Sequence, residues 1–241
     1  MGACITVFGF VKAEQKRSTC WRMNVEVEEI EGVYFIDEAR IKTRILNMGD
    51  PIIGTPMQAI QVNSIQDRLR RMPSVDDATV YPGVDGILKV KVTQRKPIAR
   101  IFEGSGTSYY IDEKRQMMPL SDQYSARVPV VVVKNDLEFT ENLNEDQQTI
   151  LNDISDVVSY LERDPLWNAQ IEHLALLENG EFELVPRMGN HKIVLGKSRY
   201  IDRKMKKLRA FYDAELRSRN LNIYKIINLK YRDQVIGERY Y

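Results

Sequence analysis

Apolar and polar positions alternate in several stretches of the first hundred residues. Within residues 24–30, Val25 and Val27 alternate with Glu26 and Glu28, and residues 88–93 alternate apolar side chains with lysine or threonine. A period of two residues is typical of a strand with one buried face. Ala78 and Val80 have the same spacing and predict another strand, joined to the one at residues 88–93 by the glycine-containing residues 82–86. We therefore expect three strands in this region.

The first of two predicted helices begins after Asp37. Asp37 is a favourable N-cap residue, and Ile36 with Ile41 has the spacing of a hydrophobic staple. An apolar stripe at helical spacing then follows, and Gly49 is suited to end the helix. The stripe comprises Ile41, Ile45 and Met48.

The second predicted helix begins at Ser64, which forms a capping box with Asp67. Its apolar stripe comprises Ile65, Leu69 and Met72. Pro73 ends this helix, because proline disfavours a helical conformation of the residue before it. The order of elements is thus strand, helix, helix, strand, strand.

Arg95-Lys96-Pro97 marks a boundary, because proline cannot donate a hydrogen bond within a central strand. Beyond it, strand patterns predominate. We expect strands at residues 98–102, 108–112, 128–134, 171–177, 181–186, 192–195 and 223–231. Gly104-Ser105-Gly106 predicts a hairpin, and Asn179-Gly180 and Gly189-Asn190 predict turns. Helical spacing predicts helices at residues 145–161 and 201–216.

The helix at residues 201–216 carries an apolar stripe and a basic outer face. The basic residues are Arg203, Lys204, Lys206, Lys207 and Arg209. This face is either a solvated surface or a contact for anionic lipid or nucleic acid. The acids on the same helix and the absence of aromatic residues interleaved on the basic face favour the solvated surface.

Composition excludes some classes of function. The chain has 241 residues and a net charge of +1, which argues against a nucleic-acid-binding protein that relies on a global positive field. The length suits two modest domains or one large one. Cys4 and Cys20 both lie in the N-terminal segment, outside the predicted core, and form neither a disulfide framework nor a zinc-binding pattern.

The sequence predicts no catalytic, cofactor-binding or metal-binding residues. His173 and His191 are expected to be partly exposed strand residues, since no second histidine or cysteine stands at ligand spacing. No phosphate-binding loop and no G-x-S-x-G motif occurs. An enzyme would need a cluster of titratable groups in a pocket, and the sequence offers no candidate for one.

Residues 3–11 form a short apolar run that is followed by Lys12. The run is too short to span a membrane. It is either a strand at the N-terminus or the outer end of a transmembrane helix whose beginning lies upstream.

Several motifs, in this order, resemble the extracytoplasmic region of the bacterial cell-division proteins of the FtsQ/DivIB family. The first four are Met72-Pro73-Ser74-Val75, Ala78-Thr79-Val80, Leu88-Lys89-Val90-Lys91-Val92 and Arg95-Lys96-Pro97-Ile98-Ala99. Three more are Tyr110-Ile111-Asp112, Ile193-Val194-Leu195-Gly196 and Asn228-Leu229-Lys230-Tyr231. The resemblance covers residues 23–237, with Gln94 in place of the acid that usually precedes Arg95.

The resemblance implies an α+β protein with two domains. Residues 23–96 would form a POTRA domain with the order β-α-α-β-β. Residues 97–237 would form an FtsQ-type β domain with a mixed or antiparallel sheet and flanking helices. Residues 1–22 would be the remnant of a membrane anchor with its juxtamembrane linker, and residues 238–241 a C-terminal tail.

The resemblance also implies a non-enzymatic scaffold that links components of the division machinery. The protein would be a single-pass inner-membrane protein with this region in the periplasm, concentrated at the division septum. Its partners would be the FtsB/FtsL coiled-coil pair and, through the POTRA domain, other division proteins, with no nucleic acid. The alternative is a POTRA-containing protein of outer-membrane assembly or secretion that binds polypeptides.

The partner-binding residues implied by the resemblance lie near the C-terminus. The expected site is the edge of the final sheet, formed by the strand at residues 223–231 or by residues 234–238. An unpaired edge can accept a partner strand. The site residues would be Lys230, Tyr231, Arg232 and Gly237.

Overall fold

The computed structural model describes residues 19–240 apart from 31, 123, 135–138, 140–142, 219 and 220. The apolar run at residues 3–11 and Cys4 lie outside the described residues. The chain divides into two compact units. Unit 1 comprises Met1–Lys96 with Ser121–Ala126, and unit 2 comprises Pro97–Leu120 with Arg127–Tyr241. Both units combine sheets and helices, which confirms the predicted α+β class.

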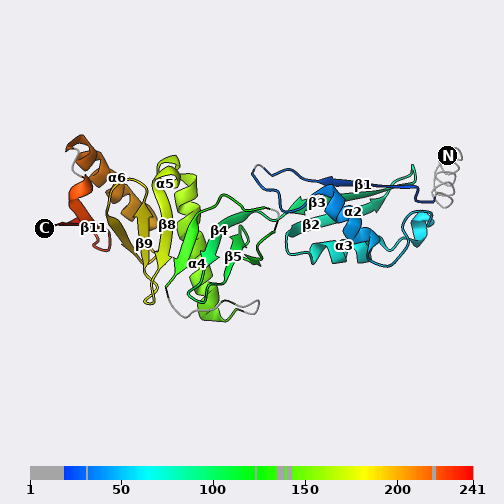
Figure 1. Ribbon diagram of the computed structural model, residues 1–241, viewed down its shortest axis with the longest axis horizontal. Helices are drawn as coiled ribbons and strands as arrows, with labels where there is room; N and C mark the ends of the chain where they lie inside the picture. Colours follow the sequence, from blue (N-terminus) through cyan, green and yellow to red (C-terminus); the bar gives the residue numbers. More distant parts are fainter. Residues whose placement is uncertain are drawn as a thin grey trace, which may run out of the picture. The chain divides into compact units, whose positions relative to one another are not determined.

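Unit 1 has a three-stranded sheet in the order β1-β3-β2 (Figure 1). β1 (Arg22–Val27) runs parallel to β3 (Ile87–Gln94), and β2 (Val75–Pro82) runs antiparallel to β3. The helices α2 (Glu38–Leu46) and α3 (Val62–Arg70) and the 3-10 helix η1 (Met57–Ala59) lie between β1 and β2 in the chain. This confirms the predicted order β-α-α-β-β.

One face of this sheet is buried. Leu88, Val90 and Val92 of β3 alternate with more exposed residues, so they share a face. α2 packs on β1 and α3 on β2, and each helix buries two residues of its apolar stripe. These residues are Ile41, Ile45, Ile65 and Leu69.

The two helices differ in how they begin. Asp37 caps α2 as predicted, since its side chain accepts a hydrogen bond from the Arg40 N–H at 2.7 Å. The capping box predicted at Ser64 is wrong. α3 begins at Val62, so Ser64 lies inside the first turn, and the N-cap residue Gln61 makes no side-chain capping bond.

Cys20 is buried, with none of its surface exposed, which corrects its predicted place outside the core. The chain there is held by residues of a distant loop. The Cys20 N–H donates to the Thr55 oxygen at 2.8 Å, and the Gly54 N–H donates to the Cys20 oxygen at 2.6 Å. Thr19 also forms an isolated bridge with Pro56. Long-range backbone pairing, which local periodicity does not record, therefore buries this cysteine.

Unit 2 has a nine-stranded mixed sheet in the order β12-β11-β10-β9-β8-β7-β4-β5-β6. The strands are β4 (Pro97–Phe102), β5 (Ser108–Asp112), β6 (Met117–Met118), β7 (Val130–Val133), β8 (Ile171–Leu176), β9 (Phe182–Pro186), β10 (Lys192–Gly196), β11 (Tyr224–Asn228) and β12 (Ile236–Arg239). The pairs β4–β7, β7–β8 and β10–β11 are parallel, and the other pairs are antiparallel.

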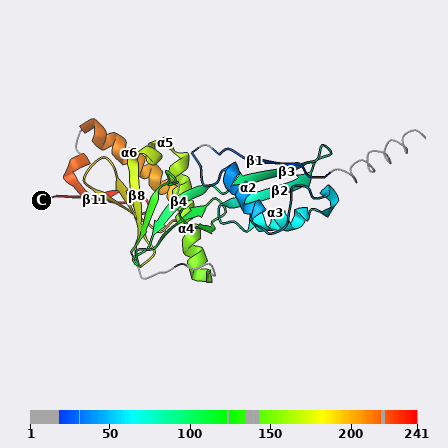
Figure 2. The same cartoon turned by 45° about the vertical axis from the view of Figure 1, so that its right-hand side comes forward.

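Helices α4 (Glu145–Arg163), α5 (Pro165–Gln170) and α6 (Ile201–Ser218) pack with this sheet (Figure 2). The 3-10 helix η2 (Leu221–Ile223) leads from α6 into β11. The predicted stripes of the two long helices contribute to one apolar core. It includes Leu151, Ile154, Val157, Leu161, Met205, Leu208 and Tyr212.

His191 is almost fully buried beside β10, which corrects its predicted partial exposure. Its Nε2 lies 2.7 Å from the Tyr212 hydroxyl oxygen, and the two rings meet edge to face. Burial lowers the pKa of His191 and raises the pKa of Tyr212, so both groups are neutral near pH 7. The pair is a neutral contact within the core.

Lys204 is only 8% exposed, so it does not belong to the expected outer basic face of α6. Its Nζ donates to the Lys197 oxygen at 2.6 Å, and burial lowers the pKa of its ammonium group. Two other basic residues of α6 are paired: Arg209 with Asp164, and Lys206 with Asp202 at 2.8 Å. The predicted basic face is thus divided among separate contacts.

Candidate functional site

The C-terminal edge of the nine-stranded sheet is the candidate site. Among the described strands, β12 has a neighbour on one side only, which is β11. The Tyr240 N–H donates to the Ile223 oxygen at 2.9 Å. Because backbone groups alternate sides along a strand, the N–H and C=O groups of Gly237 and Arg239 point away from β11. Within the described part of the chain, β12 thus presents these backbone groups on the side without a neighbouring strand, at an exposed edge.

β12 is held in place at its end by Tyr240. Its hydroxyl group donates to the Asn190 oxygen at 2.7 Å, in addition to its backbone bond to Ile223. Three of the four β12 residues, Ile236, Glu238 and Arg239, are exposed. The edge is therefore fixed at one end and exposed within the described part of the chain.

Gly237 lies in β12 and faces a buried aromatic ring. A Cβ atom at this position would lie 2.4 Å from Cε1 of Tyr224, which is closer than such atoms approach in proteins. Tyr224 is 5% exposed, its hydroxyl donates to Glu215 at 3.1 Å, and its ring packs on Phe211. Gly237 thus lets β12 approach β11 over this ring.

Tyr231 lies outside a strand, which corrects the predicted strand at residues 223–231. β11 ends at Asn228, and Tyr231 belongs to the connection from β11 to β12, with 47% of its surface exposed. Lys207 of α6 holds this connection, since its Nζ donates to the Tyr231 oxygen and to the Gln234 oxygen. The Tyr231 ring is therefore an exposed aromatic group on an anchored loop.

Lys230 is paired within the chain. Its Nζ lies 2.7 Å from Oε1 of Glu181, the residue directly before β9. The hydrogen bond from Lys230 lowers the pKa of Glu181 below its ordinary value. Arg232, in the same connection, is exposed. Of the two predicted cations, Arg232 is thus the better placed for an acidic partner.

The structure brings the four predicted residues to two neighbouring segments. Lys230, Tyr231 and Arg232 lie in the β11–β12 connection, and Gly237 lies in the edge strand. Sequence reasoning did not identify Lys207 or Tyr240, which hold these segments. Lys207 is one of several lysines beside the apolar stripe of α6, so the sequence pattern gives no signal for this role.

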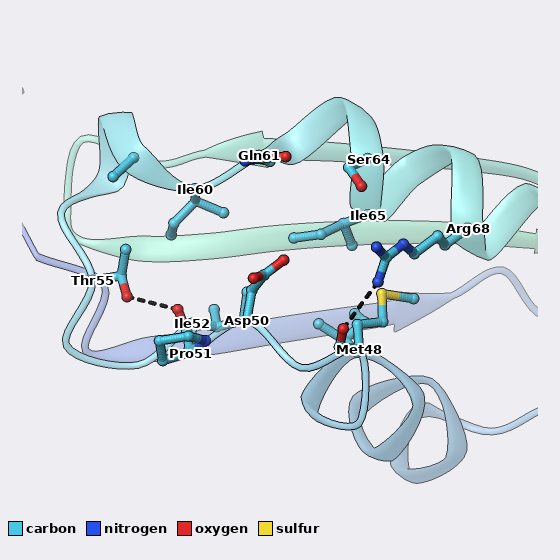
Figure 3. Close-up of a pocket in the computed structure, with 12 residues that line it drawn as sticks. Met48, Asp50, Pro51, Ile52, Thr55, Ile60, Gln61, Ser64, Ile65 and Arg68 are labelled. Carbon is cyan, nitrogen blue, oxygen red and sulfur yellow. Dashed lines mark hydrogen bonds between the residues drawn. The ribbon is translucent and has the colours of Figure 1, made fainter.

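Unit 1 contains a separate hollow between the end of α2, the loop after it and α3 (Figure 3). Its walls include Met48, Ile60 and Ile65, and the carboxylate of Asp50 points into it. The Arg68 guanidinium donates to the Met48 oxygen at 3.0 Å, across the mouth seen in Figure 3. Of the hydrogen bonds drawn there, this one joins α3 to the loop after α2, whereas the Thr55 hydroxyl donates to the Pro51 oxygen within the loop.

The described residues contain no group of three or more histidine, cysteine, aspartate or glutamate residues placed to hold a metal ion. No helix among them is both long and apolar enough to cross a membrane.

Comparisons with known proteins agree with the two-unit organisation. Residues 96–238 match the family model described as FtsQ/DivIB, C-terminal related. Residues 18–93 match a model for a POTRA-like domain. A search of curated proteins found no match. The families that match consist of scaffold domains that are in general non-catalytic, and FtsQ/DivIB proteins are membrane division proteins with a periplasmic region. Since the first match covers more than half of the chain, the chain belongs to the FtsQ/DivIB C-terminal-related family.

Proposed function

We propose that this protein is a non-enzymatic scaffold of the bacterial division machinery, which binds a partner by strand addition at β12. The observation that carries the proposal is the edge itself. β12 is exposed, fixed by Tyr240 and next to a single strand. In strand addition, main-chain hydrogen bonds supply affinity, and alternate side chains supply specificity.

The proposed partner is the FtsB/FtsL-type coiled-coil pair, and the POTRA-like unit would contact other division proteins. Membership of the family supports this assignment, and the match over residues 96–238 favours it over a role in outer-membrane assembly or secretion. The protein would sit in the inner membrane with these units in the periplasm, concentrated at the septum.

Tyr231 is the proposed side-chain anchor beside the edge. Its ring is exposed, while Lys207 fixes the backbone that carries it. Aromatic residues on a rigid support are frequent binding hot spots, because little conformational entropy is lost on binding. Lys230, Arg232 and Gly237 complete the proposed site, with Arg232 facing acids of the partner and Gly237 allowing β12 to pack.

Replacing Tyr231 by alanine tests this function. Tyr231→Ala should weaken binding of a purified FtsB/FtsL pair by more than about 1 kcal/mol, measured by calorimetry, and leave the melting temperature unchanged. Tyr200→Ala is the matched control, because Tyr200 is 64% exposed on unit 2 before α6. Equal binding by both variants and the unmodified chain would overturn the assignment of Tyr231.

A further inference from the structure

We propose that one end of unit 1 rests in the headgroup region of a phospholipid membrane. This end, which we call the entry end because the chain enters unit 1 there, comprises Trp21 and one residue at the tip of each of two loops, Ile53 and Val84. The inference rests on the membrane attachment in the proposed function and concerns a surface to which that function assigns no role.

Three apolar side chains are unusually exposed there. Trp21 is 59% exposed, Ile53 is 51% exposed and Val84 is 69% exposed. They come from three segments far apart in the sequence. Large apolar side chains gathered at one exposed end are typical of interaction surfaces.

Backbone hydrogen bonds bring the three segments together. Cys20, next to Trp21, pairs with Gly54 and Thr55, directly after Ile53. The Trp21 N–H donates to the Gly86 oxygen at 3.1 Å, which brings Trp21 to the β2–β3 turn that carries Val84. Figure 1 shows the start of β1, the loop before α3 and this turn at the same end of unit 1.

The Trp21 side chain is suited to transfer from water into a less polar medium. Its indole Nε1–H donates to the Asp85 oxygen at 2.8 Å, so the ring carries no unsatisfied donor into a less polar medium. The ring also lies over Gly86, where a Cβ atom would approach its Cδ1 to 2.7 Å. Tryptophan is the residue most typical of membrane–water interfaces, together with tyrosine.

The position along the chain indicates lipid as the occupant. Residues 12–18 separate the apolar run at residues 3–11 from Thr19. Eight residue steps span at most about 29 Å when fully extended, so an anchored run keeps the entry end near the membrane. Among the described residues within three positions of Trp21, Ile53 and Val84 in the sequence, Arg22, Asp50 and Asp85 are charged, and the Asp85 carboxylate already accepts the Ile87 N–H. This small net charge suits zwitterionic headgroups.

Tryptophan fluorescence of the full chain on phosphatidylcholine vesicles tests the inference. The chain has two tryptophans, and Trp167 is fully buried in unit 2, so lipid-dependent changes report on Trp21. We expect a blue shift and quenching by lipids brominated near the headgroup, both lost in Trp21→Phe. Val84→Asp should reduce this quenching about fivefold with an unchanged melting temperature, because the tip loses its apolar burial.

Met188→Asp is the matched control, since Met188 is 54% exposed in unit 2. It should leave the quenching of Trp21 unchanged. If the chain floats with the vesicles but Trp21 is not quenched, or if Val84→Asp and Met188→Asp behave alike, the inference is wrong while the anchor stands. If the chain does not float at all, neither the apolar run at residues 3–11 nor the entry end holds it on this lipid, and the inference is wrong. Attachment by a helix that begins upstream is a separate claim, tested by fractionating the membrane-bound protein.

Discussion

Gly237 of the edge strand lies directly against the ring of Tyr224, with room for a hydrogen atom but not for a methyl group. The two residues are in adjacent strands, β12 and β11. The resemblance to the family suggested Gly237 as a small residue at the site. The structure gives a physical reason for a small residue there, because the ring lies between the edge strand and the core.

Gly237→Ala should therefore loosen β12. The added methyl group must displace the Tyr224 ring or the strand, which costs about 1–3 kcal/mol for overpacking. Urea unfolding of unit 2 measures the loss, and hydrogen exchange at residues 236–240 locates it. Ile236→Ala, a change at the neighbouring exposed position, should cost less than about 0.5 kcal/mol. An unchanged unfolding midpoint in Gly237→Ala would contradict the role assigned to this glycine.

Lys207→Met should free the β11–β12 connection. The Lys207 ammonium donates to the Tyr231 and Gln234 oxygens, and methionine keeps the stem of the side chain but not the donors. We expect faster hydrogen exchange across residues 230–235 and a loss of about 1 kcal/mol in stability. Lys206→Met is the matched control, because Lys206 is exposed and pairs only with the nearby Asp202 among its described contacts. Equal exchange rates in both variants would show that Lys207 does not hold the connection.

The pair of Lys230 and Glu181 gives a pH-dependent contribution to stability. Lys230 lowers the pKa of Glu181 from its ordinary value near 4.5, so folding favours the ionised carboxylate. The contribution is complete above that ordinary value and is lost as the pH falls through the lowered pKa. Since the Lys230 side chain is 44% exposed, solvent screening keeps it below about 1 kcal/mol.

A titration of Glu181 by NMR checks this prediction. Lys230→Met should move the pKa of Glu181 back up toward the ordinary value, because the hydrogen bond from Lys230 that lowers it is removed. Lys192→Met serves as the control, since Lys192 lies 3.7 Å from Glu183 rather than from Glu181. If Lys230→Met leaves the titration of Glu181 unchanged, the ion pair does not form in solution.

Gln94→Leu should destabilise unit 1. The Gln94 side-chain oxygen accepts hydrogen bonds from the N–H groups of Phe35 at 3.0 Å and Ile36 at 3.1 Å, and the residue is 5% exposed. Leucine leaves both donors buried without this acceptor, at a cost of about 2–4 kcal/mol in urea unfolding. Gln94→Glu keeps an acceptor and should retain most of the stability. A leucine variant as stable as the glutamate variant would contradict this account.

Sequence patterns predicted the fold well where the signal is local. The alternation in residues 88–93, the Asp37 cap and the hairpin around Gly104-Ser105-Gly106 all correspond to elements of the structure. Each of these features depends on neighbours within a few residues. Periodicity therefore suffices for such elements.

Burial set by distant partners was not predictable in this way. Cys20 is covered through backbone pairing with residues 54 and 55, and Lys204 is covered while it donates to Lys197. His191 is enclosed by Tyr212, which lies on a helix further along the chain. In all three cases, tertiary contacts override the local pattern.

At the candidate site, the sequence left two positions open for the edge. The structure assigns the edge to β12 (Ile236–Arg239), which extends to two residues that were expected in the C-terminal tail. A four-residue strand without clear alternation carries little periodic signal. The position of β12 follows from pairing with β11. The strand predicted at residues 223–231 ended too late, because β11 stops at Asn228.

The central claim is that the backbone of β12 receives a partner strand, and substitution of Arg239 tests it most directly. Arg239→Pro removes an N–H that points away from β11, and Arg239→Ala removes the same side chain but keeps the N–H. Both variants lose the contact of the guanidinium with the Tyr224 ring, so the comparison isolates the backbone group.

The measurement is the Kd of the FtsB/FtsL pair for both variants, with melting temperatures as the check on folding. We predict that Arg239→Pro weakens binding about tenfold or more relative to Arg239→Ala, because one main-chain hydrogen bond is lost at the added strand. Equal Kd values for the two folded variants would contradict strand addition at this edge.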